Sequence, residues 1–352
     1  MKLLAAIFLI AGSYSDGTTS GISVYRFDTK TGDFEYVSDT KGILNPSYIA
    51  VSPDEKTVYS VNETRGGAVC SFRFDKTTGA LDFLNTQPAT GADPCYISLN
   101  REQTFLVTAN YSGGSLSVFP LNRDGSIRAL TQYWDMNEPE TESPASHIHT
   151  AVFSPDEKRL LVTDLGKDKI YSFKTGFRAN GTFLVRDTEA SGVLEAGSGP
   201  RHLAFHPNGK YLYSINEPAG TVTVFRYRKG NLSPVQTVAS DTTAGTGGKG
   251  SADIHISPDG KFLYSSNRLK ADGIAIFSIH PRNGRLTPAG YQPTGIHPRN
   301  FILTPDGGFL LCANRNSNQI QIFERDRETG LLRDTGKTIA VNQPACLKWI
   351  SK

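Results

Sequence analysis

Hydrophobic positions in this chain come in short runs rather than in long helical stretches. Residues 211–215 (YLYSI) and 221–225 (TVTVF) are examples, and both are rich in β-branched and aromatic side chains. Gly, Asn, Asp and Pro fill the gaps between such runs, and these residues favour tight turns. The pattern therefore predicts β-strands joined by hairpins over nearly the whole length.

One turn recurs along the chain and sets the period of the pattern. It first appears as Ser52-Pro53-Asp54. Related copies lie at residues 100–102 (an eroded one), 154–156, 206–208, 257–259 and 304–306. An apolar run precedes each copy and another follows it; then come an alternating run, a turn such as residues 76–79 (KTTG), and a fourth run. Four strands in roughly 50 residues are the unit of a β-propeller blade.

The two ends of the chain predict how the ring closes. Residues 7–14 match the second strand of a blade, as at 104–111, and residues 344–350 match a first strand. The C-terminus then supplies the innermost strand of a blade whose other strands come from the N-terminus. With six complete units, this predicts an all-β, seven-bladed propeller with four antiparallel strands per blade, in a single domain of residues 1–352. A pair of β-sandwiches predicts neither the period nor the matching ends.

Composition and charge narrow the range of partners. Lys and Arg total 37 against 34 Asp and Glu, so the formal charge of +3 gives no reason to expect a nucleic acid or a membrane as partner. The four cysteines form no CxxC pair, and buried thiols are expected. Residues 3–12 are apolar enough to resemble a short signal peptide. The strand interpretation of this run favours a cytoplasmic protein, and the alternative is export to the periplasm.

Connectivity places the unusual chemistry of the chain on one face. In an up-and-down blade, the loop before strand one and the loop after strand two open on the same side. The residues directly after the second strands are Tyr14, Glu63, Tyr111, Leu165, Glu217, Arg268 and Arg315. The residues at the start of the innermost strands are Ser47, Cys95, His149, Arg201, Ala252, Arg299 and Ala345, with His147, His202, Asp253, His255 and His297 close by.

Together these positions predict a charged ring at one mouth of the central channel. Its members are Glu63, His147, His149, Arg201, His202, Glu217, Arg268, Arg299 and Arg315. Charged groups in a confined channel must pair with each other or bind something. Salt bridges that only close the channel mouth are one interpretation, and a functional site is the other. Residues 246–250 (TGGKG) add Lys249 to this face, but they lack the spacing of a nucleotide-binding loop.

An acid and a histidine among several arginines suit the hydrolysis of an ester or lactone. The reaction needs a base that activates water, a role open to Glu217 or His149. It also needs cationic donors where the carbonyl oxygen becomes negative, which Arg201 or Arg268 can supply. Further arginines are able to hold a carboxylate or phosphate of the substrate. Composition alone does not select the substrate.

Several segments resemble the lactonase family of seven-bladed propellers, which includes bacterial 6-phosphogluconolactonase and the 3-carboxy-cis,cis-muconate lactonising enzyme. The resemblance extends over essentially the whole chain. Its most specific segments are residues 147–149 (HIH), 153–156 (FSPD), 199–210 (GPRHLAFHPNGK), 216–217 (NE) and 266–268 (SNR). This family implies a cleft in which a histidine, two arginines and a glutamate are catalytic.

By this resemblance the catalytic residues are His149, Arg201, Glu217 and Arg268, since register favours His149 over His147. The residues then expected to contact the substrate are His147, His202, Arg299, Glu63, Arg315 and Lys249. The expected reaction is hydrolysis of a sugar lactone such as 6-phosphogluconolactone, a small-molecule substrate, with no cofactor and no metal. An acidic segment at residues 138–142 (EPETE) lies near this face and is expected to affect the choice of substrate.

Three other interpretations stay open at this point. A muconate-type enzyme would form a lactone rather than open one. A non-enzymatic propeller would bind a carbohydrate or a protein on the same face, with the arginines as a carboxylate clamp. A metal-dependent lactonase would use glutamate with His147 and His149 as ligands, although the neighbouring arginines would repel a dication. Lactone hydrolysis measured with and without a chelator separates these interpretations.

Overall fold

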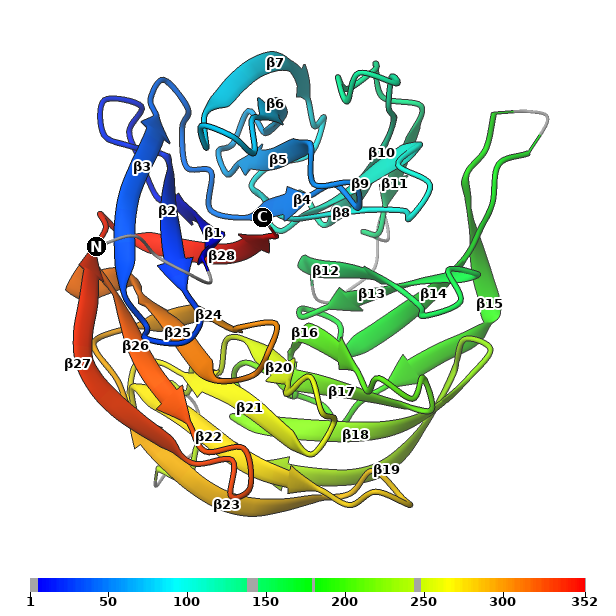
Figure 1. The fold of residues 1–352 in the computed structure, drawn as a ribbon. Helices are drawn as coiled ribbons and strands as arrows, with labels where there is room; N and C mark the ends of the chain where they lie inside the picture. Colours follow the sequence, from blue (N-terminus) through cyan, green and yellow to red (C-terminus); the bar gives the residue numbers. More distant parts are fainter. Residues whose placement is uncertain (1–5, 138–144, 179–180, 244–247, 352) are drawn as a thin grey trace.

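The computed structural model describes residues 6–137, 145–178, 181–243 and 248–351. In these ranges the chain forms seven four-stranded antiparallel sheets, which are arranged as blades around a ring (Figure 1). The seven-bladed propeller predicted from the repeat is thereby confirmed. The one helical element in these ranges is a 3-10 turn at Arg315–Ser317. No helix in the described part of the chain is long and apolar enough to cross a membrane.

Six blades each use four consecutive strands, and the seventh joins the two ends of the chain. The six are β4 (Ile49–Val51), β5 (Thr57–Asn62), β6 (Ala68–Phe74) and β7 (Leu81–Pro88); β8 (Pro94–Leu99), β9 (Phe105–Asn110), β10 (Ser115–Pro120) and β11 (Gln132–Asp135); β12 (Ile148–Phe153), β13 (Arg159–Asp164), β14 (Lys169–Thr175) and β15 (Leu184–Val193); β16 (Pro200–Phe205), β17 (Tyr211–Asn216), β18 (Thr221–Arg228) and β19 (Asn231–Ala239); β20 (Ile254–Ile256), β21 (Phe262–Asn267), β22 (Gly273–Ile279) and β23 (Leu286–Pro293); and β24 (Pro298–Leu303), β25 (Phe309–Asn314), β26 (Gln319–Arg325) and β27 (Leu332–Ala340). The seventh is β28 (Pro344–Ile350), β1 (Ala6–Ser13), β2 (Ile22–Asp28) and β3 (Phe34–Thr40).

The last strand of the chain closes the ring. In the seventh blade, β1 pairs antiparallel with both β28 and β2, so that Leu9 lies opposite Trp349 on one side and Tyr25 on the other. Figure 1 shows β28, in red, beside the dark blue β1. The apolar run near the N-terminus is therefore a strand, and the predicted shared blade is confirmed.

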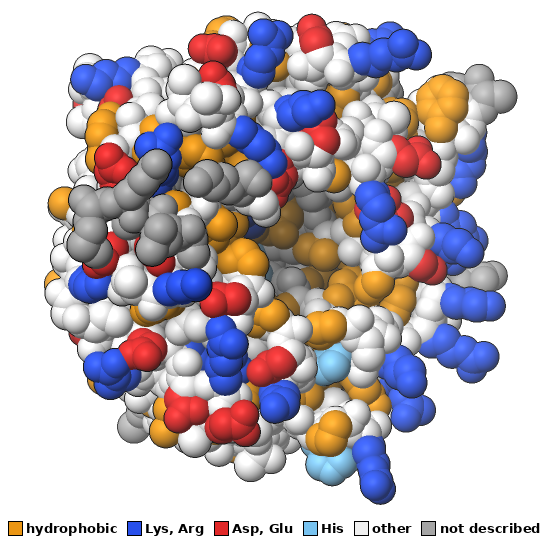
Figure 2. Space-filling view, in the orientation of Figure 1, with side chains coloured by type: hydrophobic (Ala, Val, Ile, Leu, Met, Phe, Trp, Pro, Cys, Tyr) orange, Lys and Arg blue, Asp and Glu red, His pale blue; other side chains and the backbone are white. Residues whose placement is uncertain are grey.

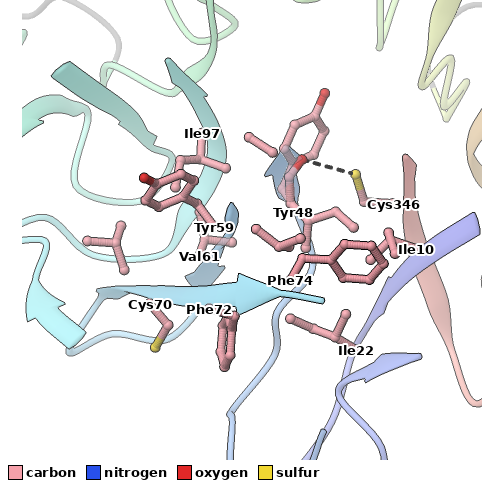
Figure 3. Close-up of a cluster of buried hydrophobic side chains, with 14 of the residues drawn as sticks. Ile10, Ile22, Tyr48, Tyr59, Val61, Cys70, Phe72, Phe74, Ile97 and Cys346 are labelled. Atoms are coloured by element: carbon pink, nitrogen blue, oxygen red, sulfur yellow. Dashed lines mark hydrogen bonds between the residues drawn. The ribbon is translucent and has the colours of Figure 1, made fainter. Parts of the chain in front are cut away.

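Apolar side chains fill the spaces between neighbouring blades. One cluster joins the shared blade to the blade of β4–β7, and Figure 3 shows the ring of Phe74 beside Ile10 within it. Cys70 and Cys346 belong to the same cluster. All four cysteines are buried and free, as expected for small apolar fillers.

The recurrent Ser-Pro-Asp turn joins the first strand of a blade to the second. Ser52 Oγ donates a hydrogen bond to Asp54 Oδ1 (2.7 Å) and accepts one from the backbone N–H of Thr57 (2.9 Å). The residue after the aspartate adopts the left-handed conformation, with φ of +58° at Glu55 and +71° at Gly260. These turns hold the blade together locally and leave the chemistry to the opposite face.

Candidate active site

A β-bulge at the start of the innermost strands re-aims several side chains. The pairing between first and second strands skips Arg201 in β16, Arg299 in β24 and His149 in β12. A bulged residue has no partner in the ladder, so its side chain leaves the regular alternation of the strand. The same position holds Cys95 in β8 and Ala345 in β28. One backbone feature, repeated from blade to blade, thus presents the functional groups.

The ends of the second strands supply the groups that face them. Asn216, the last residue of β17, is buried, and its Nδ2 donates to Thr221 Oγ1 and Thr223 Oγ1 (both 2.9 Å). These bonds anchor the strand end immediately before Glu217. Asn267 anchors the strand end before Arg268 in a similar way, because its Oδ1 accepts a hydrogen bond from Ser251 Oγ of the loop before β20 (2.6 Å). Asn216 and Asn267 therefore have a structural role, and the residues that follow them, Glu217 and Arg268, carry the charge.

Glu217 lies between two buried guanidinium groups. Its Oε2 is 2.8 Å from Arg201 Nε, and its Oε1 is 3.0 Å from Arg268 Nη2. Both arginines are buried, whereas 29% of the Glu217 side chain is exposed. Burial acts to raise the pKa of Glu217, but the charges of Arg268, Arg201 and Arg299 outweigh it and hold this pKa below its usual value. The carboxylate is therefore ionised at neutral pH.

Protein acceptors hold the two guanidinium groups in place. Arg268 Nε donates to the carbonyl oxygen of Gly250 (2.8 Å). Arg201 Nη1 donates to the carbonyl oxygen of Ala252. Burial, and then the charge of Arg201, lowers the pKa of Arg268 to about 9, so that this side chain is still a cation at neutral pH. Two fixed cations therefore flank one carboxylate.

His149 is a buried imidazole beside this cluster. Its ring centroid lies 5.1 Å from that of His202 and 5.6 Å from that of Tyr111. Burial, and then the charge of Arg201, lowers the pKa of His149 well below its usual value. Among the residues that the structure describes, its Nδ1 has no hydrogen-bond partner. His149 is thus neutral at neutral pH, which is the form in which an imidazole can accept a proton.

Two further histidines border the site, His147 beside Tyr111 and His297 beside Arg268. His147 is half-buried, and its ring stacks on Tyr111 with 4.6 Å between the centroids. His297 Nε2 lies 3.4 Å from Arg268 Nη1. Burial, and then the charge of Arg268, lowers the pKa of His297 to about 3. Within the described ranges, no group of three or more His, Cys, Asp or Glu side chains is arranged to hold a metal ion.

His202 has protein partners on both ring nitrogens. Its Nδ1 lies 2.7 Å from Asp253 Oδ1, and its Nε2 lies 3.3 Å from Arg201 Nη1. The edge of its ring meets the rings of Tyr48 and Tyr96. These side chains line a cavity of about 300 Å³ that extends toward the Ser-Pro-Asp-type turns. Figure 2 shows that the centre of the ring is hollowed. These partners place the imidazole beneath the arginine cluster.

A second charged group adjoins the first. Tyr14 Oη donates to Glu63 Oε2 (2.8 Å), and Ser47 Oγ donates to the same carboxylate. Arg299 Nη2 lies 3.8 Å from Glu63 Oε2. The guanidinium groups of Arg299 and Arg315 lie 5.2 and 4.1 Å from the centre of the Tyr14 ring. Burial raises the pKa of Tyr14 to about 12, so its hydroxyl stays protonated and can donate.

The structure brings the predicted charged residues together, with an excess of positive charge. The cations are Arg201, Arg268, Arg299 and Arg315, and the carboxylates are Glu217 and Glu63. The charge of Arg299 acts on the pKa of His149 as well as that of Glu217, so the two groups form one electrostatic environment. Such an environment suits an anionic substrate, or a reaction in which an oxygen becomes negative.

Lys249 makes a different contact from those predicted for it. Its Nζ donates to the carbonyl oxygen of Asp241 (2.9 Å), which tethers the loop before β20 to the end of β19. A role for Lys249 in binding substrate stays a prediction. Residues 246–247 of the glycine-rich loop and the acidic segment 138–142 lie outside the described residues.

Four site neighbours were missing from the set of residues predicted to act on the substrate: Tyr14, Ser47, Cys95 and Tyr111. All four belong to the two sets of positions compared across the blades, directly after the second strands and at the start of the innermost strands. Their positions alone could therefore have identified them. Their uncharged side chains did not single them out. Cys95, for example, donates from Sγ to the carbonyl oxygen of His149 (3.5 Å) and is a packing neighbour of the site.

Comparison with known proteins agrees with the fold. The family model described as "Lactonase, 7-bladed beta-propeller" matches residues 8–349. The 6-phosphogluconolactonase of Formosa agariphila is 39% identical over 349 residues, which cover 97% of this chain and 98% of that protein.

Solved structures show the same likeness. A Bacteroides fragilis protein assigned as a 6-phosphogluconolactonase is 47% identical with a TM-score of 0.93, over 100% of this chain and 99% of the other. The periplasmic gluconolactonase of Pseudomonas aeruginosa is 32% identical with a TM-score of 0.90, over 98% of this chain and 99% of the other. The chain therefore belongs to the lactonase family of seven-bladed β-propellers.

Proposed function

We propose that this protein hydrolyses a sugar lactone, with 6-phosphogluconolactone as the first candidate substrate. Relatives that carry this activity in their names match the chain over nearly its full length. The observation that carries the site is the clamp of Glu217 between Arg201 and Arg268, beside the neutral His149. A base and two oxyanion donors are what lactone opening by water requires.

In the proposed mechanism, water attacks the carbonyl carbon of the lactone and the carbonyl oxygen becomes an oxyanion. The ring C–O bond then breaks, and the ring oxygen takes up a proton to give the hydroxy acid. Arg201 and Arg268 stabilise the oxyanion, because both cations are fixed before the reaction begins and need no reorganisation. Removal of one such donor typically costs about 100-fold or more in rate.

Two groups are placed to accept the proton of the attacking water. Glu217 is ionised and partly exposed, although the two arginines weaken its basicity. His149 is neutral, although its unpartnered Nδ1 is buried, and burial and the same arginines weaken its basicity. The pH profiles of the Glu217→Gln and His149→Gln variants identify the base, because the acid limb of kcat/KM disappears with the group that causes it.

The second charged group provides a place for an anionic end of the substrate. Arg299 and Arg315 flank Tyr14, and Arg315 Nε is buried with no hydrogen-bond partner in the described part of the chain. Guanidinium forks fit phosphate and carboxylate oxygens. The likeness to the Pseudomonas gluconolactonase, whose name includes no phosphate, makes an unphosphorylated gluconolactone the second candidate substrate.

Loss of the clamp tests the proposed reaction. Glu217→Gln and Arg201→Ala are each expected to lower kcat/KM for 6-phosphogluconolactone by about 100-fold or more, measured by acid release with and without EDTA. Thermal melting shows whether each variant is folded. Glu157→Gln is the matched control, because Glu157 is also paired with an arginine but lies in a Ser-Pro-Asp turn. Parental rates in both clamp variants would refute the site.

Substrate choice tests the role of the second group. Arg315→Met is expected to raise KM for 6-phosphogluconolactone by about tenfold, the loss of one charge-assisted contact of about 1.4 kcal/mol, and to leave KM for gluconolactone unchanged. Arg327→Met is the control, since Arg327 belongs to the same blade but lies in the turn between β26 and β27, on the opposite face. An equal change for both lactones would show that Arg315 does not bind phosphate.

A further inference from the structure

Asp253 is a buried carboxylate that takes no part in the mechanism above. It directly precedes β20 and is 3% exposed. Five protein groups donate to its oxygens: the side chains of His202, His255 and Asn300, and the backbone N–H groups of Ile254 and Phe301. A carboxylate so fully satisfied is held in a single orientation.

The contact of Asp253 with His202 determines which nitrogen of that ring carries a proton. An ionised carboxylate only accepts hydrogen bonds, so His202 Nδ1, 2.7 Å from Asp253 Oδ1, must be the donor. The pKa of His202 is about 4, lowered by burial and then by Arg201, so the ring carries one proton at neutral pH. The other nitrogen, Nε2, is then an acceptor.

That acceptor faces the active-site arginine. Arg201 Nη1 lies 3.3 Å from His202 Nε2, and Arg201 Nε lies 2.8 Å from Glu217 Oε2. In the opposite tautomer, Nε2–H would point at the guanidinium N–H, and two donors would face each other. The tautomer of His202 therefore decides whether this ring is a third partner of Arg201, besides Glu217 and the carbonyl oxygen of Ala252.

We propose that Asp253 is a positioning residue of the lactonase site, which holds His202 as the Nδ1-protonated tautomer so that Nε2 accepts from Arg201 and keeps that guanidinium against Glu217. The kinetic part of this inference rests on the proposed function, whereas the tautomer does not. Asp253 reaches the reaction through two other side chains, His202 and Arg201, one step further than the carboxylates that orient metal-binding or catalytic histidines.

The tautomer is measured directly by NMR of protein with ¹⁵N-labelled histidine. The chain has seven histidines, and the His202 signals are those that the His202→Phe variant lacks. At neutral pH we expect a protonated Nδ1 and an unprotonated Nε2. A protonated Nε2, in either the neutral or the charged ring, would overturn the proposal whatever the activity of the enzyme.

Asp253→Asn separates positioning from packing. Its kcat for the lactone is expected to fall by about 10- to 100-fold, the usual effect of losing a supporting partner, while KM changes by less than about threefold. Asp187→Asn is the matched control, because Asp187 of the outermost strand β15 is also buried and is paired with Arg159 of β13 (3.1 Å) and Lys174 of β14 (3.6 Å). This control is expected to lower the melting temperature and to keep kcat. A parental kcat in folded Asp253→Asn would overturn the proposal.

His202→Phe keeps the proposal testable if Asp253→Asn does not fold. Phenylalanine retains the ring contacts with Tyr48 and Tyr96 but cannot accept from Arg201. Its kcat is expected to fall as far as that of Asp253→Asn, and the double variant to fall no further, because both changes break one chain of contacts. Parental kcat in His202→Phe, or additive losses, would overturn the proposal. If Glu217→Gln and Arg201→Ala both kept parental rates, the proposed function would fail while the NMR result still stood.

Discussion

At the scale of single residues, the surroundings of His149 and His202 keep both imidazoles neutral well below the pH at which a free histidine becomes protonated. Both imidazoles are buried, and Arg201 lies beside each of them, so burial and positive charge together lower their pKa values. Each ring therefore stays neutral in the folded protein at a pH where it is protonated in the unfolded chain. The neutral forms suit a site that already has an excess of cations.

This difference predicts that stability depends on pH between 6.5 and 5. Because the unfolded chain binds more protons there, stability is complete above about pH 6.5 and is lost as pH falls toward the lowered pKa values, by about 1.4 kcal/mol per pH unit for each fully buried histidine. Urea denaturation of His149→Phe is expected to show a shallower pH dependence. His280→Asn is the control, because His280 is exposed; an unchanged slope in His149→Phe would contradict the argument.

Which residues share the site could be predicted from register, but their partners could not. Glu217 and Arg268 follow second strands, and Arg201 starts an innermost strand, so connectivity alone brought them to one face. The bulge at Arg201 leaves no mark in the hydrophobic pattern. The contact between His202 and Asp253 spans two blades, so it depends on how closely neighbouring innermost strands approach.

At the scale of elements, the turns between third and fourth strands also dock on the next blade. Gly330, between β26 and β27, has φ of +75°, and its carbonyl oxygen accepts a hydrogen bond from Tyr264 Oη of β21 (2.7 Å). A Cβ at Gly330 would lie 2.3 Å from the ring of Phe262. Residues 327–330 (RETG) repeat the type of turn noted at residues 76–79, and packing against the neighbouring blade adds a second reason for glycine there.

Alanine substitutions separate these two reasons. Gly330→Ala is expected to destabilise the protein by about 2–4 kcal/mol, because the strain of the left-handed backbone, about 1 kcal/mol, adds to overpacking of about 1–3 kcal/mol. Gly336→Ala is the control in the same blade, with φ of +73° but open space around the added carbon, and is expected to cost only about 1 kcal/mol. Equal losses in urea denaturation would show that docking of the turn contributes nothing.

At the scale of the whole molecule, the ring depends on the last strand of the chain. β28 covers the inner edge of β1, and its residues Cys346, Leu347 and Ile350 are buried against the neighbouring blades. The matching ends of the sequence were sufficient to predict this closure. The C-terminal segment resembles a first strand, and the N-terminal blade lacks a first strand of its own.

Removal of residues 344–352 is expected to abolish cooperative unfolding or to cause self-association through the open edge of β1. Each buried side chain lost is worth about 1.5–3 kcal/mol, and together these losses approach the total stability of a typical protein, about 5–15 kcal/mol. Thermal melting and size-exclusion chromatography measure both effects. Removal of residues 351–352 alone is the control. A monomeric truncated chain with the parental melting temperature would show that closure by β28 is dispensable.

The bulge that carries Arg201, Arg299 and His149 has a consequence for how such a site changes over time. The same bulged position recurs in other blades. A substitution at such a position would therefore place a new side chain at the channel mouth without any change in the loops. Two of these positions hold the small residues Cys95 and Ala345. Both side chains are buried, so a longer charged residue at either position would add a group to the channel mouth and would also have to displace its present packing neighbours.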